Sequence, residues 1–249
     1  MTDNSPVNWF PVEYEDLAEQ AQLVADTTDF WLLDLTGKGQ KISRLKKLLD
    51  ETEQARARAY RFREHRHRYI LRRAFQRIIL GAYCAVEPSQ LEYDTDHPEK
   101  PALPAASGIS FSAANSGNLG LLSVSHLPVG IDLEHMLGQP ALDLVAKDNF
   151  TKFEQERLQG LSRDNWLRGF TRLWTQKEAV LKLQGIGLSM SPLEITVADS
   201  QDAARWTDPQ KGPESWSLHT FQADDLAIAT AATSVPIRHT RFFRFGVSA

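Results

Sequence analysis

The chain has 249 residues with a formal net charge of −4 at pH 7, which allows one large or two small domains with real cores and argues against a general nucleic-acid binder. Cys84 is the only cysteine, so an intrachain disulfide and a cysteine-rich metal site are excluded. The first residues lack the basic and apolar segments of a signal peptide, and no apolar run approaches the ~20 residues of a membrane span. We therefore expect a cytoplasmic protein that does not interact with membranes.

The first half of the chain predicts helices between short strands. The apolar run Asp29–Leu35 predicts a strand, and the spacing of leucines predicts a helix from Ile42 to about Phe62. A second helix is expected from about His65 to Tyr83. Further strands, punctuated by Pro and Gly, are expected at Leu91–Tyr93, Ile109–Ser112, Leu119–Val124 and Val129–Leu133.

The second half follows the same scheme. A short helix is expected at Ala141–Lys147, and the capping-box pattern from Thr151 to Glu154 predicts the start of another. Strand-like runs follow the long helix described next, at Leu193–Val197, Ser215–Phe221, Leu226–Ala231 and Arg241–Phe245. We therefore predict an α+β protein of two similar α/β lobes, residues 1–127 and 128–249, joined near Leu127–Pro128.

The segment from Ser162 to Gly185 predicts a long helix over residues 163–184, with Ser162 as N-cap and Gly185 as the stop. Its apolar residues recur at helical spacing and mark a buried stripe: Trp166, Phe170, Leu173, Trp174 and Leu181. Lys177, Glu178 and Lys182 interrupt that stripe. Buried charge costs free energy unless a partner or ligand compensates it, so Glu178 and Lys182, neighbours at i and i+4, are candidate site residues.

A second anomaly is the pair of carboxylates in the expected strand Val129–Leu133 and its continuation. Asp132 and Glu134 lie two residues apart, so they face the same side of a strand at roughly 7 Å. Like charges at this spacing repel unless a cation lies between them. A Mg²⁺ ion with Glu178 as a third ligand is one interpretation; a strand end facing solvent is the other.

Two polar stretches precede this strand. Arginines crowd one region, at positions 56, 58, 61, 63, 66, 68, 72, 73 and 77. They indicate either nucleic-acid or phosphate binding or a solvated helix face that pairs with acidic residues, and the second interpretation is favoured for most of them. Lys100-Pro101 and the polar run Ile109–Gly117 predict either a phosphate-binding loop or an ordinary turn. Together with the carboxylates and lysines, they suit transfer of a phosphate-containing group.

The order of these motifs resembles the 4′-phosphopantetheinyl transferases of the surfactin-synthetase-activating type. The motifs are Lys100-Pro101, Phe111–Gly117, Gly130–Glu134, Phe150–Glu154 and Trp174–Lys182. The resemblance implies two α/β lobes related by a pseudo-twofold, with the active site in the cleft between them. It implies transfer of 4′-phosphopantetheine from coenzyme A to a serine of an apo acyl or peptidyl carrier protein, with release of 3′,5′-ADP, as in a holo-acyl-carrier-protein synthase.

The resemblance also implies roles for individual residues. Asp132, Glu134 and Glu178 would bind Mg²⁺ at the coenzyme A diphosphate. Glu178, or a metal-bound water, would help to remove the serine proton, and Lys182 would neutralise charge on the phosphate. The segment after Lys182, with Leu183, Ile186 and Leu188, would meet the carrier protein. The contacts to coenzyme A would come from Lys100, Arg68, Arg58 or Arg61, Asn115 and Ser116.

One position departs from the family pattern. Asn115 stands where the family usually has a histidine that contacts coenzyme A phosphate, and an amide donates hydrogen bonds but is never cationic. Two alternatives therefore stay open: a relative that binds coenzyme A or carrier proteins without transfer, and another Mg²⁺-dependent phosphoryl or nucleotidyl transferase. We expect a monomer, because the two-lobe length suffices, and the sequence leaves the carrier protein unspecified.

Overall fold

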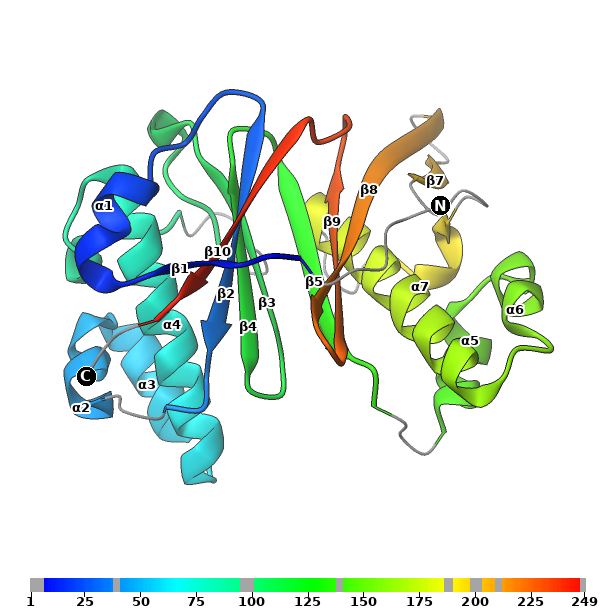
Figure 1. Cartoon of the computed structure of the whole chain (residues 1–249), viewed down its shortest axis with the longest axis horizontal. Coiled ribbons are helices and arrows are strands. Elements are labelled where there is room, and N and C mark those ends of the chain that lie inside the picture. The colour runs from blue at the N-terminus through cyan, green and yellow to red at the C-terminus, as the bar shows by residue number, and fades with distance from the viewer. Residues whose placement is uncertain are drawn as a thin grey trace.

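The computed structural model describes residues 7–37, 41–94, 101–137, 141–185, 190–197, 203–208 and 212–246. Two five-stranded sheets lie face to face in the middle of the molecule, and each carries a layer of helices on its outer side (Figure 1). This mixed arrangement confirms the predicted α+β class. Within the described ranges, no helix combines the length and apolarity needed to cross a membrane.

The first sheet has the strand order β1-β10-β2-β4-β3. β1 (Phe10–Val12), β10 (His239–Phe245) and β2 (Thr27–Asp34) run parallel, and β4 (Leu119–Ser125) pairs antiparallel with both β2 and β3 (Ser110–Ser116). The helices on its outer side are α1 (Leu17–Gln20), α2 (Ile42–Leu45), α3 (Glu51–Ala59) and α4 (Arg63–Cys84).

The second sheet is antiparallel throughout, with the order β5-β9-β8-β7-β6. Its strands are β5 (Val129–His135), β9 (Ala227–Thr233), β8 (Gly212–Asp224), β7 (Ala203–Asp208) and β6 (Thr196–Val197). Its helices are α5 (Leu142–Asn149), α6 (Lys152–Leu158) and α7 (Arg163–Gln184). Among the described residues, short 3-10 turns lie at Tyr14–Asp16, Lys46–Leu48, Pro88–Gln90, Ala105–Ser107 and Pro192–Glu194.

Three apolar cores correspond to the three spaces between the four layers. One lies between the first sheet and α1–α4, and another between the second sheet and α5–α7, where Phe170 stacks between Trp166 and Trp174. The third joins the sheets, with Phe30 of β2 packed against Phe221 of β8. Burial of apolar side chains stabilises each layer against the next, so the two sheets form one continuous body.

The sheets also meet along β3 and β5, whose contact is polar. The hydroxyl oxygens of three β3 serines accept hydrogen bonds from β5 backbone N–H groups: Ser110 from Val129, Ser112 from Ile131 and Ser116 from His135, at 3.0–3.3 Å. Alternate strand residues share a face, so these serines form one row. The row fixes the register between the lobes at the place where the carboxylate strand runs.

Several expected elements are confirmed. The long helix spans residues 163–184 as predicted and ends at Gly185, whose φ of 65° is left-handed. Ser162 is its N-cap residue, although its side chain makes no capping hydrogen bond. The capping box of Thr151 and Glu154 is present at the start of α6.

Other expectations were wrong in their bounds. The helix expected from Ile42 to Phe62 is interrupted, because Asp50 caps α3 in a capping box with Glu53 and forces extended backbone before it. Leu91–Tyr93 is not a strand. Most of the expected strand Leu193–Val197 is a 3-10 turn, and only Thr196–Val197 pairs in the sheet.

The chain returns to the first sheet at its end. β10 follows all of the second sheet in sequence, yet it lies between β1 and β2. A lobe division at 127/128 stays a prediction, and β10 belongs spatially with the N-terminal residues rather than with the C-terminal half. The pseudo-twofold relation of the lobes also stays a prediction.

Candidate active site

Helix α7 crosses β5 at very close range, and Gly130 makes this possible. A Cβ atom at Gly130 would lie 2.1 Å from the carbonyl oxygen of Ala179 and 2.3 Å from the backbone nitrogen of Leu183. Only glycine permits such an approach of backbone to backbone. The crossing therefore places the last turns of α7, with Glu178 and Lys182, directly over the strand that carries Asp132.

Lys182 and Asp132 form the central contact of the site. The ammonium Nζ lies 2.6 Å from Asp132 Oδ1. Asp132 is 5% exposed, and its other oxygen, Oδ2, is buried without a hydrogen-bond partner. Burial raises the pKa of Asp132 to about 6, against the opposing effect of Lys182. A buried carboxylate oxygen without a partner costs free energy, so this site is incomplete without a further cation or donor.

Glu134 and Glu178 complete a group of three carboxylates that influence one another. Burial raises the pKa of both side chains, and the charge of Asp132 adds to the increase at Glu178. The charge of Glu178 likewise raises the pKa of Glu134, whose Oε2 accepts a hydrogen bond from the Ser116 hydroxyl at 2.7 Å. β5 and α7, far apart in sequence, thus carry three acids that interact electrostatically in pairs, with Lys182 in contact with Asp132.

The metal prediction is a separate matter. Among the described residues, no three His, Cys, Asp or Glu side chains are grouped as a metal site requires. Instead, the ammonium of Lys182 contacts Asp132, and the Ser116 hydroxyl donates a hydrogen bond to Glu134. The unpartnered Oδ2 of Asp132 nevertheless fits a hard cation, which prefers carboxylate oxygens. Metal binding by Asp132, Glu134 and Glu178 therefore stays a prediction.

The end of β3 and the turn after it form a second polar group beside these acids. Asn115 and Ser116 lie on the strand itself, not in a loop as expected, and Asn115 is exposed. Arg68 of α4 donates a hydrogen bond to the carbonyl oxygen of Gly117 at 3.3 Å. His135 lies next to Gly117, with its Nδ1 buried and without a partner. Ser116, the Gly117 turn and His135 thus meet at one end of β5, whereas Asn115, the strand neighbour of Ser116, points to the other face of β3.

A pocket of about 270 Å³ opens at the other end of the α7–β5 crossing. It is lined by Pro101, Ala102, Leu103, Ile109, Ser110, Phe111, Leu183, Gln184 and Gly185. The pocket therefore lies between the first lobe and the end of α7. Lys100, a predicted coenzyme A contact, lies outside the described residues, immediately before Pro101 in the sequence. Ile186 and Leu188 of the predicted carrier-binding segment also lie outside the described residues.

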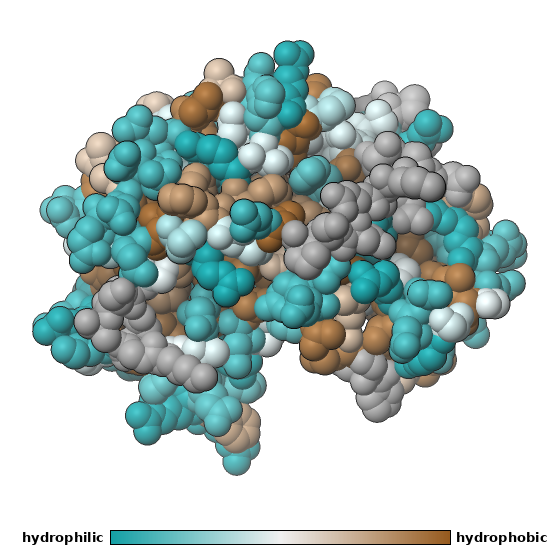
Figure 2. All heavy atoms as spheres, viewed as in Figure 1, coloured by the Kyte–Doolittle hydropathy of each residue, from teal (hydrophilic) through white to brown (hydrophobic). Residues whose placement is uncertain are grey.

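The surface between the lobes is indented. The space-filling view shows a hollow at its lower edge, between the two helical layers, where the β3–β4 turn lies in Figure 1 (Figure 2). The side of the hollow on the left of this view is mostly hydrophilic, whereas hydrophobic residues lie on its right side.

Several arginines of the basic stretch stabilise the fold. Arg73 and Arg77 pair with Glu53, Arg77 also pairs with Asp50, and Arg66 donates to a backbone carbonyl. Of the predicted coenzyme A contacts, Arg58 is exposed on α3, and Arg61 is exposed and lies over the ring of Phe62. The expected pairing with acidic residues is thus confirmed for Arg73 and Arg77, but the expected solvated face is wrong for them, because both side chains are largely buried.

Lys177 has a role that the sequence did not reveal. It is fully buried, its Nζ lies 2.7 Å from Glu154 Oε2, and it donates to the carbonyl oxygens of Pro192 and Ile195 at 2.7 Å each. The capping box of α6 was the available sequence indication, because it fixes Glu154 at a buried helix start. Lys177 holds α6 and the turn at Pro192–Glu194 onto α7 and faces away from the site.

Comparison with known proteins identifies relatives over most of the chain. The family model described as "4'-phosphopantetheinyl transferase superfamily" matches residues 128–231, from β5 through α7 to β9. The 4'-phosphopantetheinyl transferase HetI of Nostoc sp. is 34% identical over 217 residues, which cover 85% of this chain and 90% of the relative. The 4'-phosphopantetheinyl transferase Sfp of Bacillus subtilis is 26% identical over 196 residues, or 78% of this chain and 87% of the relative.

The Nostoc relative carries the assignment, because its match includes both lobes and the α7–β5 crossing. The lower identity to Sfp leaves the narrower surfactin-type assignment a prediction. By the extent of this similarity, and in agreement with the resemblance of its motifs, the chain belongs to the 4′-phosphopantetheinyl transferase superfamily.

Proposed function

We propose that this protein transfers 4′-phosphopantetheine from coenzyme A to a serine hydroxyl of an apo carrier protein and releases 3′,5′-ADP. The relatives named 4′-phosphopantetheinyl transferase support the reaction class. The observation that carries the proposal is the 2.6 Å contact between Lys182 and Asp132. It brings together two motifs that are 50 residues apart in sequence, with Glu134 and Glu178 beside them.

The reaction needs a base and charge neutralisation. The serine oxygen attacks the phosphorus that carries pantetheine, the bond from that phosphorus to the bridging oxygen breaks, and 3′,5′-ADP leaves with the electron pair. Glu178 takes the serine proton. Its half-buried position and the nearby Asp132 raise its pKa, which strengthens the carboxylate as a base near neutral pH.

Lys182 provides positive charge that can turn toward substrate. Its side chain is 33% exposed, and it donates a hydrogen bond to Asp132. An ammonium beside the diphosphate stabilises the charge that collects on the phosphate oxygens as the bond to phosphorus breaks. Arg68, Asn115 and Ser116 extend this group of donors along the end of β3.

Asp132, Glu134 and Glu178 would hold a Mg²⁺ ion, as the donor set and the unpartnered Asp132 oxygen suggest. Such an ion, when bound, neutralises negative charge on the diphosphate. Without it, the three carboxylates raise one another's pKa values, in the pairs named above. The metal requirement can be tested directly by chelation and by replacement of Mg²⁺ with an inert monovalent salt.

Coenzyme A extends from these acids into the pocket at Pro101–Leu103. The pocket lies directly beside the residues that follow Lys182, and Lys100 and Arg58 are the further contacts that the family pattern suggests. The carrier protein approaches the segment after Lys182. The proposal further takes the enzyme to be a cytoplasmic monomer, which sedimentation and cell fractionation would test.

One assay tests the reaction. The protein is incubated with coenzyme A, Mg²⁺ and an apo carrier protein, and the carrier is weighed by mass spectrometry. A gain of one phosphopantetheine supports transfer. Coenzyme A binding without a gain on fatty-acid, polyketide or peptide carriers would indicate a binding module, and ATP binding in its place another transferase.

A paired substitution tests the role assigned to Glu178. Glu178→Gln removes one charge from the acids and the proposed base, so we expect transfer to fall by a factor of about 10² or more with the fold intact. Glu156→Gln, an exposed residue on α6, is the matched control and should keep wild-type activity. A fully active Glu178→Gln variant would remove this residue from the site.

A further inference from the structure

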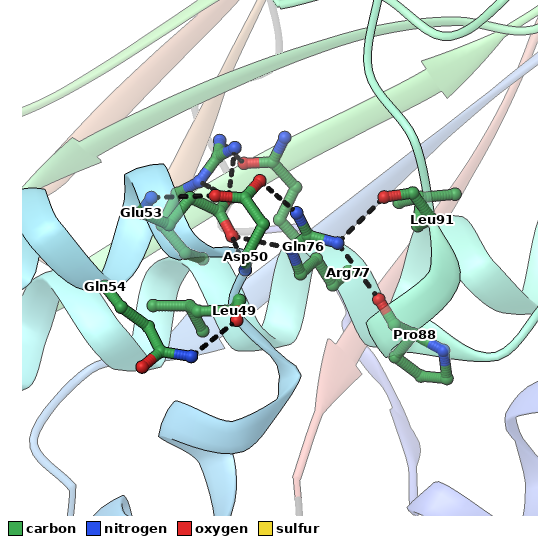
Figure 3. Close-up of polar contacts among 9 residues, drawn as sticks. Leu49, Asp50, Glu53, Gln54, Gln76, Arg77, Pro88 and Leu91 are labelled. Carbon is green, nitrogen blue, oxygen red and sulfur yellow. Dashed lines mark hydrogen bonds and ion pairs between the residues drawn. The ribbon is translucent and has the colours of Figure 1, made fainter.

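An ion cluster lies where α3 meets α4, with the buried Arg77 as its centre and the exposed Asp50 at its edge (Figure 3). Arg77 is 1% exposed. Its Nε donates to Glu53 Oε2 and its Nη2 to Asp50 Oδ2, both at 2.6 Å. Asp50 and Glu53 also form the capping box of α3, and Arg73 pairs with Glu53 from the same helix. Two guanidinium groups thus balance two carboxylates.

The remaining donors of Arg77 reach a different segment. Its Nη1 donates to the carbonyl oxygens of Pro88 at 3.2 Å and Leu91 at 2.8 Å (Figure 3). Pro88 begins the 3-10 turn Pro88–Gln90 after α4, and Leu91 directly follows this turn. The planar guanidinium has a fixed geometry, so it holds this turn at a defined distance and angle from α3.

That turn leads to the pocket wall by two routes. Leu91 is buried in the same core as Leu103 and Phe111, which line the pocket. The backbone N–H of Asp94, three residues after Leu91, donates to the carbonyl oxygen of Ala102 at 2.8 Å. A shift of Leu91 would therefore move the segment that forms one wall of the pocket.

Stability alone is a poor explanation for this cluster. Burying ions is costly, and apolar residues of the same volume often stabilise a fold at least as well. An apolar side chain at position 77, however, would leave two carbonyl oxygens without donors and would not fix their direction. The cluster is thus better suited to holding a segment in place than to adding stability.

We propose that Arg77 is a positioning residue for coenzyme A binding: by holding the backbone at Pro88 and Leu91, it fixes the Pro101–Leu103 wall of the pocket beside α7. This inference rests on the proposed function, because it takes the pocket to receive part of coenzyme A. Arg77 itself touches no substrate.

The test compares two identical substitutions in one lobe. Arg77→Lys keeps the positive charge but removes the planar guanidinium that donates to the carbonyl oxygens of Pro88 and Leu91. Arg241→Lys is the matched control, since Arg241 also grips a buried carboxylate, that of Asp29, at 2.6 and 2.7 Å. Arg241 lies on β10, separated from the pocket strand β3 by β2 and β4.

Three measurements are made on each full-length variant: coenzyme A binding by calorimetry, steady-state kinetics, and amide hydrogen exchange at Asp94. For Arg77→Lys we expect about tenfold weaker binding and a matching rise in KM for coenzyme A, with kcat changed less than about twofold. Exchange at Asp94 should be faster. Arg241→Lys should show none of these effects, even where it lowers the melting temperature as much.

A milder variant guards against misfolding. Asp50→Asn keeps a good N-cap for α3 but removes one of the two negative charges that pair with Arg77. It should therefore also weaken coenzyme A binding and speed amide exchange at Asp94. Equal coenzyme A binding in Arg77→Lys, Asp50→Asn and wild type would overturn the inference and leave the proposed function standing. A wild-type protein that binds no coenzyme A would overturn both.

Discussion

The buried pair of Lys177 and Glu154 gives a direct test of the division between structural and reacting charges on α7. Both side chains are fully buried and lie 2.7 Å apart. Lys177→Met leaves the Glu154 carboxylate without its counter-charge and two carbonyl oxygens without donors. Removing one partner of a buried pair costs about 3–5 kcal/mol, a large part of the 5–15 kcal/mol that stabilises typical domains.

Urea unfolding followed by circular dichroism measures this loss, and Lys152→Met, exposed on α6, is the matched control. The double variant Lys177→Met with Glu154→Gln should cost less than the sum of the single changes, because neither charge is then left alone. Gln also keeps the capping box. If Lys177→Met is as stable as wild type but inactive at low temperature, Lys177 takes part in the chemistry and our reasoning is refuted.

Two further changes test the packing and charge of the site, and a third tests a buried histidine between the two sheets. Gly130→Ala should push α7 from β5 and abolish transfer, with a melting temperature well below wild type; an active, stable variant would contradict the close crossing. Asn115→His should tighten coenzyme A binding several-fold in calorimetry, since an imidazole can carry positive charge at a phosphate, and unchanged or weaker binding would remove residue 115 from the site. Burial lowers the pKa of His219 below its ordinary value of 6.5. Below pH 6.5 the unfolded chain therefore binds a proton at this histidine more readily than the folded chain does. The free energy of unfolding consequently decreases as the pH falls through 6.5. The melting temperature of His219→Phe relative to wild type should therefore rise as the pH is lowered from about 8 to about 5. A difference that stays constant with pH would contradict the role of the His219 pKa.

Local patterns predicted the elements that local physics determines. The α7 stripe and Gly185 define a helix by spacing and backbone freedom, and the structure agrees to the residue. The break before α3 was also present in the sequence, as the capping pair Asp50 and Glu53, but the leucine spacing before it suggested a continuous helix. A capping box outweighs helical spacing when its first residue adopts extended backbone.

Long-range pairing lay beyond such patterns. β10 pairs in parallel with β2, a strand about 200 residues earlier in the chain, and nothing in either strand marks its partner. The pairing partners of the charged residues on α7 were equally beyond prediction from spacing. A carboxylate that balances a buried lysine can come from any element, so spacing alone could not separate Lys177 from Lys182.

The surroundings of the two lysines do separate them. Lys177 has an acid and two carbonyl oxygens around its ammonium, at 2.7 Å each, so it cannot turn to a ligand without breaking contacts between α6 and α7. Lys182 is partly exposed, and the acid it contacts has a second oxygen without a partner. Under the proposed function, a diphosphate would compete with Asp132 for the ammonium of Lys182, and Asp132 would then be available to hold a cation. Of the two lysines, only Lys182 can change partners in this way without breaking the packing of α6 on α7.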